Sequence, residues 1–241
     1  MTNVKFLTLA CAMLCSATVS AQFTTSGKSG SVSTDETTDY NLFGISYVNE
    51  TFSYDFPKGY DDADNIGTNG FALKYLHGFS VSKSLPMFVE TGLNLNFNFG
   101  SMDYYNDDAS VKYQFAALAV PVNFAYRFKA NESVTIKPYL GLNVKFNLMG
   151  RTKWEFEDDE DTDYDEKDDS TSWCSLYSKN DMGDSHAVWN RFQLGWHIGA
   201  DLQFNRFYIG LNYGTDFIKA YSYKKYKINS GTLNIGVGVY F

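Results

Sequence analysis

The chain has 241 residues and a net charge of −8, and 44% of its residues are hydrophobic and 17% aromatic. This length suits one domain of the larger all-β or barrel type. An acidic chain disfavours nucleic-acid binding, which needs a clustered basic surface, and dense aromatics argue against disorder. Heavy aromatic and glycine usage with a mean hydropathy of −0.30 fits neither a helical membrane protein nor an ordinary soluble one.

The N-terminus has the pattern of a secretory signal peptide. Lys5 provides the positive charge, residues 6–14 form a short apolar run, and Ala21 ends a small-residue stretch suited to cleavage. The apolar run is too short for a permanent membrane anchor. We therefore expect a signal peptide over residues 1–21 and a polar N-terminal segment over residues 22–39.

Long runs of the mature chain alternate between apolar and polar residues. The last run places Leu233, Ile235, Val237, Val239 and Phe241 on one face, and Thr232, Asn234, Gly236, Gly238 and Tyr240 on the other. Residues 87–99, 134–148 and 192–204 repeat the pattern. These runs exceed the roughly five or six residues of ordinary strands and are long enough to cross a bilayer tilted. Small and amide side chains on the polar face suit a narrow barrel interior, so the apolar face is expected to meet lipid.

Eight such segments can be counted along the chain. They cover residues 40–48, 69–81, 86–100, 111–128, 133–151, 188–204, 206–218 and 230–241. Short and long connections alternate between them, as in outer-membrane barrels with short periplasmic turns and long extracellular loops. We predict an all-β, eight-stranded antiparallel up-and-down transmembrane β-barrel over residues 40–241. Ten strands are the alternative, because residues 51–56 also alternate and could extend the first hairpin above the membrane.

Aromatic residues gather near the short turns and the C-terminus, where rings can lie at the level of the lipid headgroups. We expect one aromatic belt there, formed by Phe79, Phe88, Phe128, Phe204, Phe207 and Phe241.

The signal peptide, the eight alternating segments and the terminal LNIGVGVYF together resemble the small outer-membrane β-barrel, or porin-family, proteins of Gram-negative bacteria. The resemblance covers essentially the whole mature chain and implies a place in the cell outer membrane, in contact with its lipid. In that group a last strand with a terminal aromatic residue is read by the barrel-assembly machinery, and Val237, Val239, Tyr240 and Phe241 match its form. The resemblance implies no single activity.

Charged residues of both signs are predicted to face the lumen. Because an eight-stranded barrel is just wide enough for side chains to fill, we expect them to pair into a polar network that plugs it. A narrow porin-like channel for small solutes is the alternative. The predicted network comprises Lys74, Glu90, Arg127, Lys137, Lys145, Arg191, His197, Asp201 and Asp216.

Acidic residues concentrate in the long loops, and 13 of the 28 lie within residues 152–187. A solvated loop explains them, and binding of divalent cations or of an extracellular ligand is the sharper alternative. Asp62 and Asp64 precede Gly67 in a loose acidic turn, but Ile66 occupies a ligand position of the EF-hand pattern. We therefore predict no metal site.

Catalytic chemistry finds little support in the residue pattern. His186 follows Asp184 and Ser185, but adjacent loop residues rarely achieve the geometry that a nucleophile and base require. His197 and Asp201 share the inward face at a spacing that suits a polar pair. We predict no catalytic residue and no cofactor.

The sequence thus favours a structural or surface-interaction protein with a plugged lumen and acidic extracellular loops. A narrow channel is the first alternative, and a lipid-modifying enzyme is the least supported. Cys174 is the single cysteine after cleavage, so it cannot form an intrachain disulfide and is interpreted as incidental.

Overall fold

A computed structural model describes residues 38–55, 65–82, 85–104, 109–131, 133–156, 172–183 and 188–241. The predicted signal peptide and nearly all of the polar segment 22–39 lie outside this part of the chain. Within the described ranges, the structure contains no helix long and apolar enough to span a membrane.

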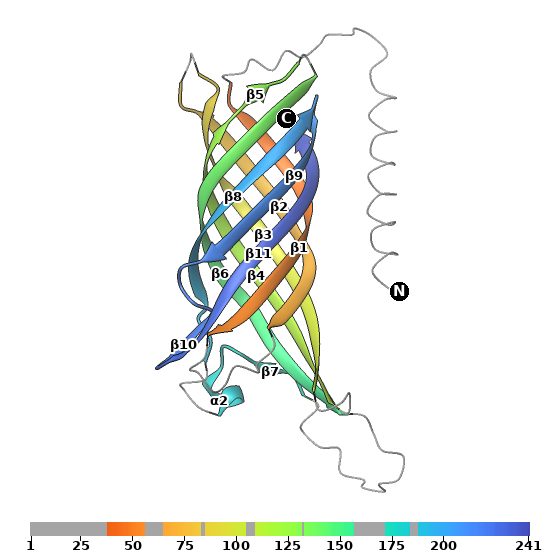
Figure 1. The fold of residues 1–241 in the computed structure, drawn as a ribbon, viewed down its shortest axis with the longest axis vertical. Helices are drawn as coiled ribbons and strands as arrows, with labels where there is room; N and C mark the ends of the chain where they lie inside the picture. The colour runs from red at the N-terminus through yellow and green to blue at the C-terminus, as the bar shows by residue number, and fades with distance from the viewer. Residues whose placement is uncertain are drawn as a thin grey trace, which may run out of the picture. The chain divides into compact units, whose positions relative to one another are not determined.

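Eight long strands form a closed antiparallel barrel (Figure 1). Each strand pairs with its neighbours in chain order, and pairing of the first strand with the last, from Leu42↔Tyr240 to Asp55↔Lys227, closes the ring. The predicted fold class and the eight-strand count are confirmed. The strands are β1 (Tyr40–Asp55), β2 (Ile66–Ser80), β3 (Met87–Tyr104), β4 (Ala109–Tyr126), β6 (Val134–Phe156), β8 (Phe192–Phe204), β9 (Phe207–Asp216) and β11 (Tyr226–Tyr240).

Shorter elements decorate the ends of the barrel without entering the ring. β5 (Phe128–Lys129) and β7 (Cys174–Ser175) pair with β6, and β10 (Tyr221–Tyr223) pairs with β11. The single-turn helix α2 (Lys179–Met182) begins where the Ser178 side chain accepts a hydrogen bond from an amide of its first turn, and it ends at a left-handed glycine.

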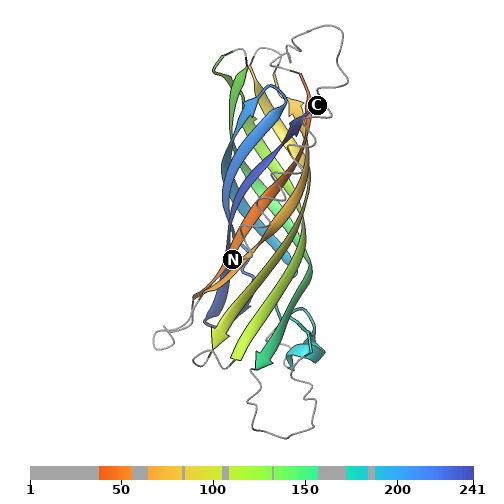
Figure 2. The same ribbon diagram turned by 90° about the vertical axis from the view of Figure 1, so that its right-hand side faces the viewer.

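The two ends of the barrel differ in their connections. The start of β1 and the end of β11 lie at one end, where Asn41 and Phe241 exchange backbone hydrogen bonds of 2.8 and 3.0 Å. The tight turn between β8 and β9 also lies there, with Asn205 at a φ of 52°. The strand ends at Asp55 of β1, Tyr104 of β3, Phe156 of β6 and Asp216 of β9 lie at the opposite end (Figure 2). Since short turns of outer-membrane barrels face the periplasm, the opposite end faces the cell exterior.

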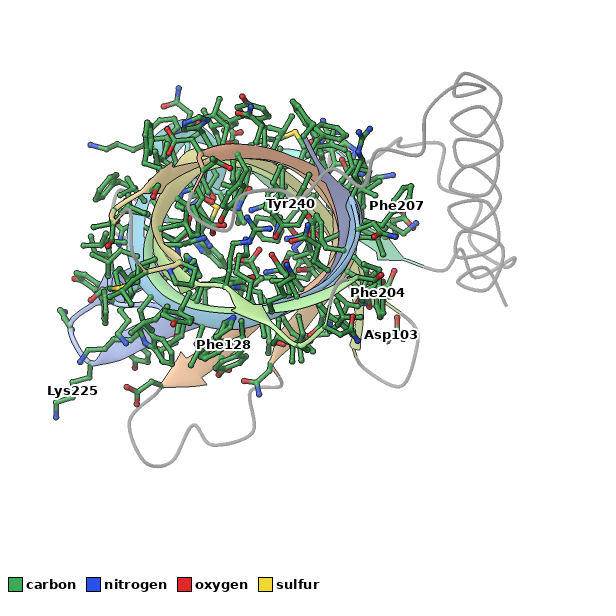
Figure 3. All side chains as sticks on the ribbon, turned by 90° about the horizontal axis from the view of Figure 1, so that it is seen from above. Asp103, Phe128, Phe204, Phe207, Lys225 and Tyr240 are labelled. Carbon is green, nitrogen blue, oxygen red and sulfur yellow. The ribbon has the colours of Figure 1, made fainter. Side chains whose placement is uncertain are left out.

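The apolar outer surface is tall enough to cross a bilayer. Along β6 the exposed apolar residues run from Ile136 to Leu148. At the usual strand rise and barrel tilt this distance is about 30 Å along the barrel axis, the thickness of a hydrocarbon core. Figure 3, a view along the barrel, shows Phe128, Phe204 and Phe207 outside the wall and Tyr240 inside it.

One residue of the predicted aromatic belt is misplaced. Phe88 is fully buried in the lumen rather than exposed to lipid. It lies on the same face of β3 as Glu90, two residues further along the strand, so the alternation of that strand decides its side. For this residue, strand alternation therefore predicts the side of the wall better than proximity to a short turn does.

The strands extend further toward the exterior than the alternation predicted. β1 continues to Asp55 instead of ending at residue 48, and β6 continues to Phe156. The predicted extension of the first hairpin above the membrane is confirmed, because Phe52 pairs with Ile66. Above the lipid-facing surface the pattern of polarity inverts. Phe115 is buried inside the barrel while Lys112 is exposed outside it, since water replaces lipid around this part of the wall.

Candidate functional site

The periplasmic half of the lumen is closed by one lysine and two carboxylates, which we call the inner network. Lys137 from β6 forms ion pairs with Glu90 of β3 and with Asp201 of β8, the latter at 3.0 Å. The Tyr40 hydroxyl donates a hydrogen bond to Glu90, and the Tyr240 hydroxyl donates one to Asp201 at 3.2 Å. All three charged residues are at most 1% exposed. Each carboxylate is thus paired with the lysine and accepts a hydrogen bond from a tyrosine hydroxyl, as buried charges require.

Arg127 lies nearest the periplasmic mouth and is also buried. Its guanidinium donates to Gln203 Oε1 at 3.0 Å and lies over the rings of Tyr40 and Phe88, at 5.1 and 5.7 Å from their centroids. Such cation–π contacts hold an arginine where no carboxylate is in reach. The side chain fills the lumen between the inner network and the periplasm.

A second charged group, the outer network, lies toward the exterior. Lys145 of β6 forms ion pairs of 2.9 Å with Glu50 of β1 and 2.8 Å with Asp216 of β9. Glu50 also accepts hydrogen bonds of 2.7 Å from the Ser230 hydroxyl and from the Asn98 amide. The three charged side chains are at most 9% exposed. The same design, a lysine between two acids, therefore occurs at two levels of the lumen.

Between the two networks lies a polar cavity of about 80 Å³. Since one water needs roughly 10–15 Å³ of such space, the cavity can hold a few waters. Lys74 points toward the Tyr208 ring, 5.5 Å from its centroid, and His197 Nε2 lies 2.7 Å from Asn123 Oδ1. The remaining lining is rich in amides, from Asn94, Asn96, Asn98, Asn143, Asn212 and Asn234.

An apolar cluster, the apolar cap, fills the lumen above the outer network. The ring of Phe52 lies 4.9 Å from Phe115 and 5.4 Å from Trp189, between centroids. Leu176 and Trp189 enter from the connection between β6 and β8, and the Leu176 amide donates to the Gly150 carbonyl at 2.9 Å. Toward the exterior, apolar side chains therefore fill the lumen in addition to the predicted polar network. The buried members of the cap are Phe52, Ile66, Val111, Tyr113, Phe115, Leu176, Trp189, Ala220 and Ile228.

Arg191 departs from its predicted place in the lumen network. It precedes β8 and is exposed. Its guanidinium donates to the carbonyls of Asn147 and Leu148 at 3.2 and 3.1 Å and lies 4.6 Å from the centroid of the Tyr177 ring. Arg191 thus links the connection between β6 and β8 to the barrel wall. Burial beside the cap raises the pKa of the Tyr177 hydroxyl. The other eight predicted residues lie inside the barrel. Arg127 fills the periplasmic end of the lumen, and the remaining seven lie in the two networks or around the cavity.

Glu50 is the charged residue of the lumen that the sequence reasoning missed. It lies just beyond the predicted first strand, which was ended at residue 48. Val48, Glu50 and Phe52 are nevertheless spaced by two residues and are all buried on one face of β1. Continuing the alternation through the polar outward residues would have found it.

The predicted candidates outside the barrel wall fall mostly beyond the described residues. This applies to His186 with its neighbours, to Asp62 and Asp64, and to residues 157–171 of the acidic loop. In the described part of the chain, no group of three or more His, Cys, Asp or Glu side chains is placed to hold a metal ion. His197 and Asp201 contact different partners, Asn123 and Lys137, rather than each other.

Charged side chains cover the outer surface of β4 and β6 above the lipid-facing residues. Glu155 forms ion pairs with Lys112 and with Lys153, the latter at 3.1 Å. Hydrogen bonds from Lys112 and then Lys153 hold the pKa of Glu155 below its usual value. Arg151 donates to Gln114 Oε1 at 2.9 Å through Nε. This surface is wetted by water, and the apolar surface ends below it.

The closed ring, the apolar outer surface and the filled lumen define a transmembrane outer-membrane β-barrel. The family described as "Outer membrane protein beta-barrel domain" matches residues 20–219. The chain therefore belongs to this family, and its place is the outer membrane of the Gram-negative envelope. No curated protein matches it.

Several solved outer-membrane barrels are similar to the chain. Ail, the attachment invasion locus protein of Yersinia pestis, in complex with the heparin analogue sucrose octasulfate, is 16% identical with a TM-score of 0.43, and the match covers 84% of this chain and 99% of Ail. Neisserial surface protein A is 13% identical with a TM-score of 0.35, over 82% of this chain and 96% of its own. OprG of Pseudomonas aeruginosa is 12% identical with a TM-score of 0.33, over 84% and 95%.

Proposed function

We propose that this barrel is a surface-interaction protein whose lumen is closed and whose partners meet its extracellular end. The observation that carries the proposal is the filling of the lumen at three levels, by the inner network, the outer network and the apolar cap. A continuous aqueous path would require all three to rearrange. The barrel then serves as a rigid support for the loops.

The energetics of the two networks support closure. Separating a buried lysine from its carboxylates leaves uncompensated charge, which is destabilising by about 3–5 kcal/mol for a buried pair. Opening the lumen would break two such groups and also move Leu176 and Trp189 out of the cap. Thermal fluctuation rarely supplies this free energy, so steady conduction is not expected.

Several further assignments belong to the same proposal. Residues 1–21 are a cleaved signal peptide, residues 22–39 a polar segment, and Val237, Val239, Tyr240 and Phe241 the signal for the barrel-assembly machinery. The acidic loop within residues 152–187 is a place where divalent cations or an extracellular ligand would bind. We further propose that the protein is not an enzyme, because adjacent loop residues such as Ser185 and His186 rarely achieve catalytic geometry, and His197 and Asp201 contact different partners.

A narrow channel for small solutes is the second candidate. The polar cavity favours it, because its amides and Lys74 offer hydrogen bonds to a small polar solute. The cavity would be one compartment of a path that opens through both networks.

Liposome swelling separates the two candidates. The mature chain is refolded into phospholipid vesicles and diluted into isotonic solutions of small sugars and amino acids, with an open porin as the positive control. The proposal predicts swelling no faster than that of empty vesicles. Swelling that depends on solute size would establish the channel and overturn the closed barrel.

A further inference from the structure

The hairpin between β9 and β11 concentrates positive charge in a chain that is acidic overall. Residues 219–227, here called the basic hairpin, contain Lys219, Lys224, Lys225 and Lys227, and no acidic residue follows Asp216. The acidic residues of the extracellular side lie instead in the connections after β1, β3 and β6. The basic hairpin therefore differs in sign from the other three connections at this end of the barrel.

Within the described ranges, none of the four lysines forms an ion pair, in contrast to four lysines of the barrel strands. Lys112, Lys137, Lys145 and Lys153 each form an ion pair. Among the described residues, no carboxylate lies within ion-pair distance of any lysine of the basic hairpin. Asp55 stands opposite Lys227 in the strand register, one acid against four bases. Like charges so close repel one another until an anion compensates them.

The hairpin has regular secondary structure, because β10 pairs with β11 along it. Tyr223 pairs with Tyr226 across a two-residue turn in which Lys224 has a φ of 53°, a left-handed conformation uncommon for a residue with a side chain. At its base the Ala220 amide donates to the Ile228 carbonyl at 2.9 Å, and both residues are buried in the apolar cap. The paired backbone therefore holds the four lysines on one short hairpin.

The position of the hairpin places its charge beyond the lipid headgroups. Lys225 precedes Leu233, the first lipid-facing residue of β11, by about eight residues, which is about 20 Å along a tilted strand. The headgroup layer reaches only about 5–8 Å above the hydrocarbon. Lys224 and Lys225 are exposed, and Figure 3 shows Lys225 at the periphery, well outside the barrel wall. A partner would have to come from the aqueous exterior.

We propose that the basic hairpin is a docking site for an acidic polysaccharide of the cell surface or its surroundings. A chain of sulfate or carboxylate groups can meet several lysines at once, which a single small anion cannot. The partly exposed rings of Tyr223 and Tyr226, between the lysines, offer apolar surface to sugar rings. This inference rests on the proposed surface-interaction function and names a partner class for it.

The test uses the mature chain refolded into nanodiscs of zwitterionic phospholipid, with fluorescent dextran sulfate as the probe. Uncharged dextran of the same length is the control ligand. The variant K219Q/K224Q/K225Q/K227Q is compared with K112Q/K129Q/R151Q/K153Q, which removes the same charge elsewhere. The hairpin variant is expected to bind at least about tenfold more weakly. The dependence of its affinity on salt should fall by about one unit of slope per lysine in contact.

Folding of both variants is verified by the change in gel mobility on heating. Equal binding by the wild type and the hairpin variant, or equal loss in the control variant, would overturn the proposal. A second measurement compares the wild type and the hairpin variant for association with vesicles that contain anionic lipid. A difference between them that is seen with these vesicles and not with dextran sulfate would also overturn the proposal, because lipid headgroups would then be the partner. Dextran sulfate binding that is seen only after the Asp and Glu residues within 157–169 are neutralised would also overturn the proposal, because the acidic loop of the chain itself would then compensate the hairpin. Liposome swelling tests the closed lumen independently, so failure of the polysaccharide proposal can be distinguished from failure of the closed-barrel proposal.

Discussion

Gly44 in β1 shows how single residues set the width of the lumen. A Cβ atom at this position would overlap the hydroxyl of Tyr208 and approach the Val237 carbonyl to 3.0 Å. Tyr208 is 1% exposed. The glycine therefore admits a full tyrosine ring to a narrow barrel.

Replacing Gly44 with alanine should lower the free energy of unfolding by about 1–3 kcal/mol, because the Tyr208 ring must shift within a packed interior. Gly67→Ala is the matched control, since a Cβ there meets no atom within 4 Å. Urea unfolding in one detergent compares them. Equal stability of the two variants would contradict the packing argument.

At the scale of the element, the strands place apolar residues outward within the bilayer and inward above it. In β4 the residues Leu118 and Val120 face lipid, whereas Phe115 faces inward and Lys112 outward. The alternation predicted the strands where lipid surrounds them. It ended β1 too early, because the outward residues become polar above the membrane and no longer contrast with Glu50.

The outer surface of β1 offers a test of where the membrane ends. Ile45→Arg should destabilise the barrel in bilayers by about 2–4 kcal/mol, since a charge would enter the hydrocarbon. Thr51→Arg, on the same face but above the apolar residues, should change the stability little. Unfolding from phospholipid vesicles measures both. A large loss for Thr51→Arg would place the membrane boundary higher than the structure indicates.

The inner network joins strands β3, β6 and β8 through one lysine. Lys137→Met should lower stability by about 3–5 kcal/mol, because Glu90 and Asp201 would be buried without a cation. Adding Glu90→Gln and Asp201→Asn should recover much of the loss, since no charge is then left unpaired. Lys129→Met, at an exposed position, is the control. If the single variant were as stable as the control, the ion pairs would not hold the lumen.

For the whole molecule, the sequence indicated the barrel, its strand number and the identity of most lumen charges. Inward position follows from alternation, so Glu90, Lys137 and Asp201 could be assigned to the lumen from the chain alone. The pairing of Glu90 with Lys137 could not be assigned in this way, because they lie on strands that are not neighbours, whereas Lys137 and Asp201 stand opposite each other on β6 and β8. The apolar cap was missed for a similar reason. Leu176 and Trp189 enter it from a connection that shows no alternation.

A closed lumen is the claim on which the function depends. Single-channel recording in planar phospholipid bilayers, with the purified and refolded mature chain, tests it most directly. The proposed closed barrel predicts no discrete conductance above the bilayer background over long recordings at moderate voltage, because the inner network, the outer network and the apolar cap would block the path. Reproducible, ion-selective steps from the same preparation would contradict it.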